Sequence, residues 1–174
     1  MSPVEYMLFR ILRQLRKLPV NILGIGNPKV IFTDYFKGFE NIPAVQGIFG
    51  EKTSEVLRNL VVELSWVSGY MYVDGSDGHL VISKNYLTTG NKTDIYLDLI
   101  HELYHVKQFL EGRELFDTRY DYVERPTEIE AYRYVVQEAR RLGLSEERIC
   151  SYLRTEWMSE YDLKKLAKSV NLSC

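Results

Sequence analysis

The segment that decides the fold is NKTDIYLDLIHELYHVKQFLEG, residues 91–112. Its apolar residues recur every three or four positions, which is the spacing of one face of an α-helix. These residues are Ile95, Leu99, Leu103, Val106 and Leu110. Thr93 is a suitable N-cap residue, and Gly112 is a natural stop after the last turn. The segment therefore predicts a long helix with one buried face.

Within that helix, His101, Glu102 and His105 form the pattern H-E-x-x-H. Side chains four residues apart lie on the same face of a helix, so both imidazoles can bind one metal ion. The intervening carboxylate can take a proton from a water molecule on that ion. Asp94 and Asp98 lie on the same stripe, and each is either an acceptor for an imidazole N–H or a solvated acid near the helix start.

A catalytic zinc ion takes three protein ligands, so the helix needs a further ligand from elsewhere. Glu111 stands where the metzincin pattern requires a third histidine, which excludes that pattern. A carboxylate from the following helix is the better candidate. Thr127 and Glu130 match a capping box at the start of that helix, which leaves Glu128 free to bind the metal. Glu130 stays open as the alternative ligand.

These two motifs, H-E-x-x-H followed by E-x-x-A at residues 128–131, resemble those of the gluzincin metallopeptidases. In their details they resemble those of small members, the ImmA/IrrE-like proteins and the minimal gluzincins of archaea. The resemblance covers residues from about 70 to 142, and it implies a zincin-like fold with a strand ahead of the motif helix. It also implies one Zn²⁺ per chain, held by His101, His105 and Glu128, with Glu102 as the general base.

The chain departs from this family at Tyr132, where gluzincins often carry an Asp or Asn that supports a ligand. The resemblance also implies a Tyr or His that steadies the oxyanion of the reaction. The chain has 13 tyrosines, and the sequence does not select one of them. Tyr132, Tyr134 and Tyr161 are candidates, and each also suits a role in core or surface packing.

The bulk properties indicate a single domain over residues 1–174 with an ordinary globular composition, 45% hydrophobic and 26% charged. A net charge of −2 argues against general nucleic-acid binding. No apolar run reaches the length of about 20 residues that a transmembrane helix needs. Cys150 and Cys174 form no CxxC pattern, so we expect free thiols and a cytoplasmic location.

Residues 1–18 alternate apolar and basic side chains at helical spacing and predict an amphipathic N-terminal helix. Arginines interrupt its apolar stretch, which argues against a signal peptide. Three roles stay open for it: packing on its own domain, peripheral contact with a membrane surface or a partner, and covering the active-site cleft as a prosegment.

The other elements are predicted from turn residues and periodicity. They are a strand over 29–34, a loop or weak strand over 42–50, a helix from residue 53 or 54 to about 64, strands over 70–73 and 79–82, and a helical pair over 143–174 starting at Ser145 and Ser159. Asp74 to Gly78 reads as a plain hairpin turn, and His79 as a surface residue at a strand end. The fold class is α+β, with a small antiparallel or mixed sheet on helices and strand 79–83 at the sheet edge beside the cleft.

Together these patterns predict a zinc-dependent metallopeptidase in which Glu102 activates a water molecule on zinc. The free sheet edge would pair with an extended substrate chain, which favours a peptide or protein substrate. Two alternatives stay open: a metal-binding regulatory protein with a zincin-like fold and no hydrolytic activity, and an interaction protein that works through its basic N-terminal helix.

Overall fold

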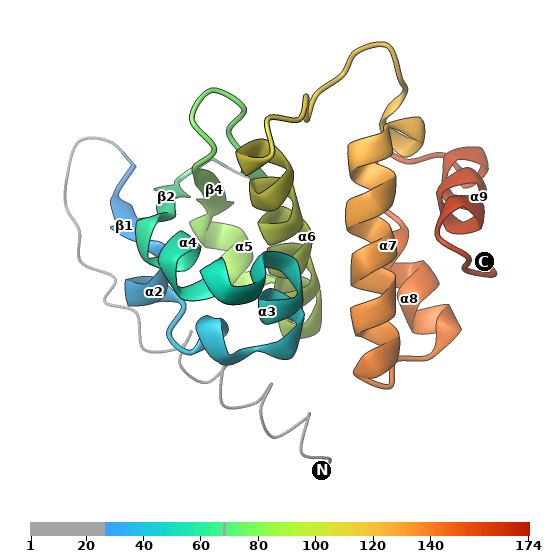
Figure 1. The fold of residues 1–174 in the computed structure, drawn as a ribbon. Coiled ribbons are helices and arrows are strands. Elements are labelled where there is room, and N and C mark those ends of the chain that lie inside the picture. Colours follow the sequence, from blue (N-terminus) through green and yellow to red (C-terminus); the bar gives the residue numbers. More distant parts are fainter. Residues whose placement is uncertain (1–26, 68) are drawn as a thin grey trace.

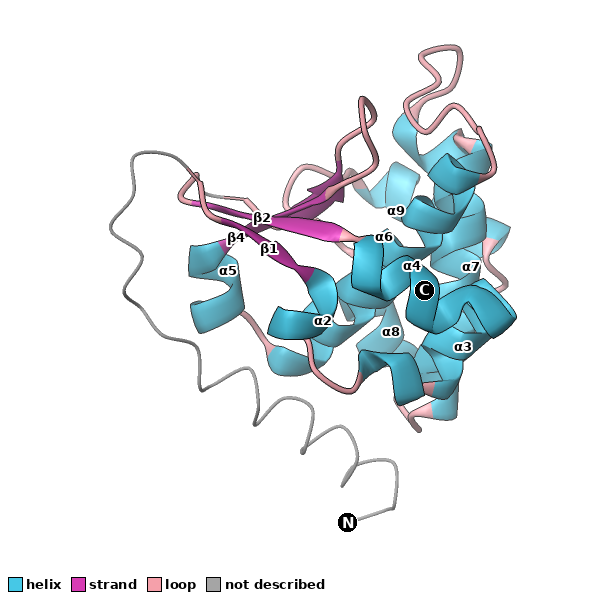
Figure 2. Cartoon of the chain, turned by 60° about the vertical axis from the view of Figure 1, so that its left-hand side comes forward, coloured by secondary structure: helices cyan, strands magenta, loops and turns pink. Residues whose placement is uncertain are grey.

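The computed structural model describes residues 27–67 and 69–174 of the chain. Over these residues the fold is α+β, with a four-stranded mixed sheet on one side and helices packed against it and beyond it (Figure 1). Figure 2 shows the sheet edge-on, with most of the helices on one of its faces. The α+β class predicted from the sequence is confirmed. The predicted helix over residues 1–18 lies outside the described residues.

The sheet has the strand order β1-β2-β4-β3. The strands are β1 (Lys29–Ile31), β2 (Val61–Ser65), β3 (Met71–Val73) and β4 (Leu80–Ser83). β2 and β4 are parallel, whereas β1 pairs antiparallel with β2 and β3 pairs antiparallel with β4. The predicted hairpin is therefore confirmed. The predicted edge strand is wrong, because β4 lies between β2 and β3 and the edge beside it is β3.

The described helices are α2 (Phe32–Tyr35), α3 (Pro43–Phe49), α4 (Thr53–Asn59), α5 (Lys84–Thr89), α6 (Lys92–Leu110), α7 (Pro126–Arg141), α8 (Glu146–Leu153) and α9 (Glu160–Ser169). Short 3-10 turns form η2 (Phe39–Asn41), η3 (Gly50–Lys52) and η4 (Tyr122–Glu124). None of the helices described in residues 27–67 and 69–174 combines the length and the apolar character that crossing a membrane requires.

Helix α6 lies at the centre of the molecule, where it contacts β3, α3 and α7. Its apolar residues are buried on several sides rather than along one stripe, as expected for a helix enclosed by other elements. Leu97, Leu99 and Ile100 are all fully buried, although only Leu99 belongs to the predicted face. Leu110, which was also assigned to that face, is exposed at the helix end.

The ends of α6 and α7 are set by local hydrogen bonds. Asn91, rather than Thr93, caps α6, because its side-chain oxygen accepts from the N–H groups of Thr93 and Asp94. Gly112 and Gly143 follow the two helices at φ values of 74° and 77°, a conformation that costs glycine little. The stop signal predicted at Gly112 therefore acts as expected, and Gly143 ends α7 in the same way.

The region before β2 differs most from the prediction. The expected strand over 29–34 ends at Ile31 and turns into α2, and the expected loop over 42–50 is helix α3. Pro43 lies in the first turn of α3, where its missing N–H costs nothing. Gly47 is tolerated inside this helix because the hydroxyl of Tyr134 occupies the place of its absent side chain, and that hydroxyl donates to the carbonyl of Ala44 at 2.6 Å.

Helix α4 ends at Asn59, about five residues earlier than predicted, and the chain continues as β2. The β-branched pair Val61 and Val62 favours a strand, and Val62 is fully buried against the core. The apolar spacing of the segment fits a helix as well, so the sequence alone did not separate the two. Because β2 pairs with β4, missing β2 also led to the wrong edge strand.

The C-terminal helical pair is confirmed, with Ser145 and Ser159 as N-caps of α8 and α9. Cys150 in α8 and the C-terminal Cys174 form a disulfide. The prediction of free thiols is therefore wrong, and the argument for a reducing, cytoplasmic location that rested on it loses its basis. The spacing of the two cysteines in the sequence did not show that α9 folds back and brings Cys174 next to α8.

Candidate metal centre

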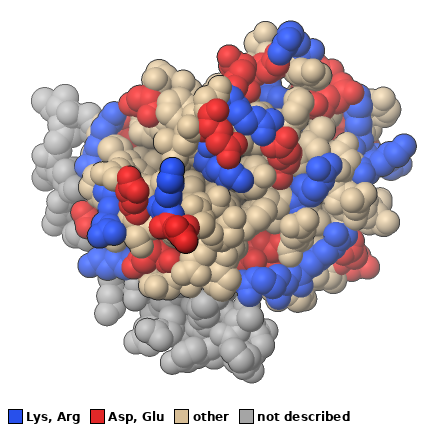
Figure 3. Space-filling model, viewed as in Figure 1, with Lys and Arg blue, Asp and Glu red and all other residues tan. Residues whose placement is uncertain are grey.

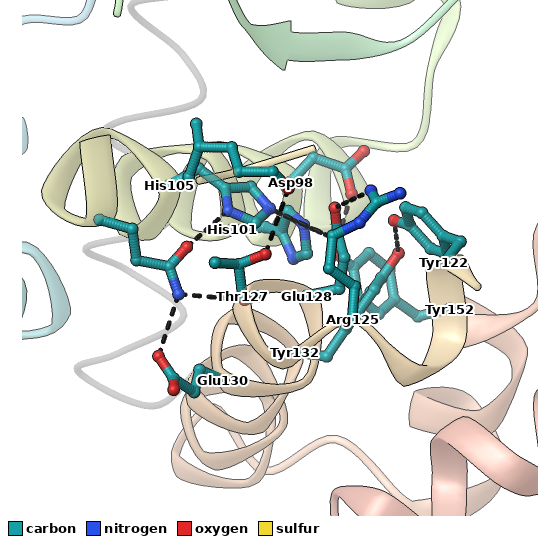
Figure 4. Close-up of polar contacts among 12 residues, drawn as sticks. Asp98, His101, His105, Tyr122, Arg125, Thr127, Glu128, Glu130, Tyr132 and Tyr152 are labelled. Carbon is teal, nitrogen blue, oxygen red and sulfur yellow. Dashed lines mark hydrogen bonds and ion pairs between the residues drawn. The ribbon is translucent and has the colours of Figure 1, made fainter. Parts of the chain in front are cut away.

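Helices α6 and α7 pack side by side and bring three predicted ligands together (Figure 4). The Nε2 atom of His101 lies 3.2 Å from Oε2 of Glu128, and Nε2 of His105 lies 3.3 Å from the same oxygen. The two Nε2 atoms are 2.9 Å apart. Bonds of about 2.0–2.1 Å to a tetrahedral zinc ion place neighbouring donors about 3.3 Å apart, so this triangle fits one ion.

The ligands come from two different helices. His101 and His105 are one turn apart on α6, and Glu128 lies in the first turn of α7. Ala131, one turn after Glu128, is fully buried, and its small side chain allows α7 to approach α6 closely. The three side chains are 5%, 6% and 5% exposed, so they form a buried cluster of two imidazoles and one carboxylate.

The cluster shifts the protonation of its own members. Burial lowers the pKa of His101, and the charge of His105 adds to this effect. Burial also disfavours the charged form of His105, but its hydrogen bond to Glu128 and the charge of Glu102 raise its pKa above the usual value. Burial raises the pKa of Glu128, yet the hydrogen bonds from both histidines outweigh it and hold this pKa far below its usual value. An ionised carboxylate among imidazoles is the form that binds a cation.

Glu102 is 8% exposed and lies next to this cluster. Burial raises its pKa from 4.5 to about 8, and a hydrogen bond with the backbone of Val73 in β3 opposes that shift. A buried carboxyl group with a pKa near neutrality is suited to accept and return a proton. The β3 edge of the sheet and the candidate base therefore adjoin each other.

The pairing of β3 with β4 determines which of its main-chain groups face the edge of the sheet. The backbone N–H of Ser83 donates to the carbonyl of Tyr70, and the backbone N–H of Asp74 donates to the carbonyl of His79. The main-chain groups of Tyr70 and Asp74 therefore point toward β4. Alternate residues in an antiparallel pair face opposite ways, so the main-chain groups of Met71 and Val73 face away from β4. Val73 is only 2% exposed and its backbone is hydrogen-bonded to Glu102, so an added chain would reach this side of β3 only after the segment that covers it moves.

Gln108 is hydrogen-bonded to the imidazole of His105, and it was not identified from the sequence as a support for this candidate ligand. Its Oε1 accepts from Nδ1 of His105 at 2.8 Å, and its Nε2 donates to the carbonyl of Thr127 and to Glu130, each at 3.1 Å. Arg113 binds the same Glu130 carboxylate through both terminal nitrogens. Gln108 lies three residues after His105 on the same face of the helix, and this spacing was the sequence signal that could have identified it.

The predicted capping box is wrong. Arg125 is the N-cap residue of α7, and no side chain caps this end. The hydroxyl of Thr127 instead donates to the carbonyl of Leu115 at 3.2 Å. Glu130 is engaged by Arg113 and Gln108, and of the two carboxylates only Glu128 lies in the donor triangle. The long segment between α6 and α7 supplies Arg113 and Leu115, and its lack of periodicity hid these two partners from the sequence.

Arg125 contacts the other oxygen of the third ligand. Its Nη1 lies 3.7 Å from Oε1 of Glu128, while Oε2 faces the two imidazoles. The Arg125 side chain is largely buried, and its Nε donates to the carbonyl of Asp117 at 3.4 Å. The two carboxylate oxygens thus have different environments, with one facing a cation of the protein and the other free for a metal.

The two aspartates expected to support an imidazole have other partners. Asp94 forms an ion pair with Arg148 of α8. Asp98 accepts from the hydroxyls of Tyr86 and Tyr152, the latter at 2.8 Å. Burial raises the pKa of Asp98 to about 6. Neither aspartate is bonded to a histidine, so of the two roles left open for them the support of an imidazole is excluded.

Of the three tyrosines considered for the oxyanion, only Tyr132 lies at the cluster. Its ring packs on that of His101 with 4.3 Å between centroids, and its hydroxyl lies 2.9 Å from that of Tyr122 (Figure 4). Tyr134 is bonded to α3, and Tyr161 is exposed on α9. Tyr122, which precedes α7 in a segment without helical periodicity, was not identified from the sequence.

A second group of possible ligands lies on the hairpin loop. Asp74, Asp77 and His79 each offer an atom within 4.8 Å of the others. Here the carboxylates already accept from groups of their own loop, Asp74 from Ser76 and Asp77 from His79. Because Asp77 is exposed and these oxygens are engaged, this group is a weaker candidate than the buried cluster.

In comparisons with known proteins, no protein-family model matches the chain, and neither a curated protein nor a solved structure is significantly similar to it.

Proposed function

We propose that the chain is a zinc-dependent metallopeptidase of the gluzincin type. The observation that carries the proposal is the buried triangle of His101, His105 and Glu128, whose donor atoms have the spacing of tetrahedral zinc ligands. Two nitrogens and one carboxylate oxygen also match the donor preference of zinc. A mixed sheet beside a motif helix, followed by a helix that carries the third ligand, supports a zincin-like fold.

When bound at this site, zinc would polarise a carbonyl group and lower the pKa of water toward about 7. Glu102 would accept the proton of the attacking water and then give it to the nitrogen of the leaving amine. Its burial against β3 keeps bulk water away from this proton transfer. Arg125 would hold one oxygen of Glu128, which leaves the other directed at the metal.

The proposed substrate is a peptide or an extended segment of a protein. The backbone of Val73 in the edge strand β3 contacts Glu102, so a chain that paired with β3, once the segment covering Val73 had moved, would run past the candidate base. Figure 3 shows acidic and basic side chains interspersed over the one face of the molecule that it draws, and a mixed surface of this kind does not favour binding of a nucleic-acid backbone.

A metal-binding regulatory protein without hydrolytic activity is the second candidate, and one observation favours it. His101, Glu102, His105 and Glu128 are all between 5% and 8% exposed, so a substrate carbonyl reaches them only if a neighbouring segment moves. Such a closed site suits a metal that stabilises the fold or reports on its own concentration.

A peptide library separates the two candidates. The chain is loaded with one equivalent of zinc, and cleavage is followed by mass spectrometry. We expect zinc-dependent cleavage that falls at least 100-fold in Glu102→Gln, which keeps the metal but loses the proton acceptor. Glu111→Gln, an exposed glutamate at the end of the same helix, is the matched control and should cleave at the parental rate.

Cleavage by Glu102→Gln at the parental rate would show that another group is the base. An absence of cleavage by zinc-loaded parent protein across the library would favour the regulatory candidate instead.

A further inference from the structure

Gln108 is one of the side chains that tie together the two helices of the candidate metal centre. It lies on α6, it is fully buried, and both ends of its amide are bonded. Burying an amide is costly unless its donors and acceptor find partners, so a core glutamine with full bonding holds its neighbours in fixed positions. We propose that Gln108 is a positioning residue that orients His105 toward the metal and sets its distance from Glu128.

The orientation of the imidazole follows from the chemistry of the amide. The Oε1 atom of Gln108 can only accept, so the Nδ1 of His105 must carry a proton and donate it. With Nδ1 protonated, the lone pair of a neutral ring is on Nε2, the atom that lies in the donor triangle. The ring is therefore held with its metal-binding nitrogen pointing at Glu128.

The amide cannot turn over without losing this arrangement. Its Nε2 donates both to the carbonyl of Thr127 and to Glu130. A flipped amide would place its oxygen against these two acceptors and its N–H groups against the N–H of His105. Arg113 fixes the Glu130 carboxylate in turn, so the orientation of Gln108 is set from outside the metal centre.

The same side chain reaches the backbone beside the third ligand. Thr127 directly precedes Glu128 at the start of α7, so the bond to its carbonyl links the position of Glu128 to that of His105. Both ligands would move relative to each other if this link were removed. A shift of a few tenths of an ångström in donor spacing is enough to weaken a tetrahedral site.

His101 offers a comparison within the same cluster. Its Nδ1 is buried and has no hydrogen-bond partner among the described residues. Its ring is held by packing against Tyr132 rather than by a hydrogen bond. The hydrogen bond through Nδ1 that orients an imidazole in this cluster is therefore the one between His105 and Gln108, which makes Gln108 the residue to test.

This inference rests on the metal site of the proposed function, and the test separates the two. Gln108→Leu removes both the acceptor and the donors, whereas Gln108→Glu keeps the acceptor toward His105 and removes the donors. Gln137→Leu, an exposed glutamine on α7, is the matched control. For each protein we would measure the zinc dissociation constant by chelator competition, the melting temperature without metal, and the NMR signal of the His105 Nδ1 proton in the zinc-loaded form.

We expect Gln108→Leu to bind zinc about 10 to 100 times more weakly than the parent. Its His105 Nδ1 proton should lose its downfield, slowly exchanging signal. Gln108→Glu should retain that signal and bind zinc with intermediate affinity, and Gln137→Leu should match the parent. A merely structural role would lower the melting temperature without moving the imidazole signal.

Zinc affinity within twofold of the parent in a folded Gln108→Leu would overturn the role of Gln108 while leaving the metal site intact. If Gln108→Leu does not fold, Gln108→Glu decides, and loss of its hydrogen-bonded Nδ1 signal overturns the inference. A parent protein that binds no zinc would overturn the proposed function itself.

Discussion

The disulfide between Cys150 and Cys174 gives a prediction whose size follows from the chain. The two residues are 24 positions apart, and their bond closes α9 and the C-terminal tail into a loop on α8. We consider the double variant Cys150→Ser and Cys174→Ser. The neighbouring contacts are retained in it: Leu172 stays buried, and Arg140 can still donate to the carbonyl of Asn171 at 2.8 Å.

Because native contacts are retained, the loss comes mainly from the unfolded chain. Closing a loop of about 24 residues removes about 12 cal/mol/K of chain entropy, which corresponds to about 3.5 kcal/mol at 25 °C. Domains are stable by only about 5–15 kcal/mol, so the bond would supply a large share. With a urea m-value of about 2 kcal/mol/M, the midpoint should fall by about 1.7 M.

The assay has two steps. Mass spectrometry of the unreduced protein after thiol alkylation should show no labelled cysteine. Urea unfolding, followed by circular dichroism in the absence of metal, then compares the parent with the double serine variant. A reductant should lower the midpoint of the parent and leave that of the variant unchanged. Two labelled thiols in the unreduced parent, or a stability loss under about 1 kcal/mol, would refute the reasoning.

Two further predictions concern the metal centre. Glu128→Gln should weaken zinc binding by a factor of 100 or more because it removes the only carboxylate oxygen in the donor triangle. Glu130→Gln should weaken zinc binding by a smaller factor. Equilibrium dialysis measures both affinities, and the reverse order would make Glu130 the ligand. The metal-free protein should become less stable between pH 6.5 and 8. In the folded state the pKa of His105 is raised above 6.5, and that of Glu102 is raised from 4.5 to about 8. Each group therefore stabilises the fold fully below its unfolded pKa, and this contribution is lost as the pH rises through its folded pKa. Melting temperatures in the presence of a chelator measure the effect, and a rise over that range would contradict the shifts.

The parts of the fold that the sequence predicts well are those with strong local signals. α6 and α7 each have a glycine at the C′ position, and α6, with its long apolar period, begins and ends within about two residues of expectation. The hairpin of β3 and β4 has turn residues between two β-rich runs. In these segments the local preference and the tertiary contacts favour the same structure.

Residues 29–65 could not be read in the same way because their elements are short. In α3 a proline and a glycine look like helix breakers, but Pro43 starts the helix and Gly47 makes room for Tyr134. In β2 the apolar spacing suits a helix, and pairing with β1 and β4 makes it a strand. Contacts distant in sequence decide both cases.

The residues of the candidate metal centre divide in the same way, into those that local sequence spacing predicts and those that it does not. His101 and His105 follow from spacing within one helix, and the structure brings them together with Glu128. Apart from Gln108, the groups around them do not follow from local spacing. Arg125 and Tyr122 come from the irregular segment before α7, and the partners of Asp98 come from α5 and α8.

The most direct test of the central claim is an anomalous difference map at the zinc absorption edge from crystals grown with one equivalent of zinc. The account predicts a single strong peak about 2.0–2.1 Å from Nε2 of His101, Nε2 of His105 and one carboxylate oxygen of Glu128. A peak on the loop formed by Asp74 and His79, or no peak in the buried triangle, would contradict it.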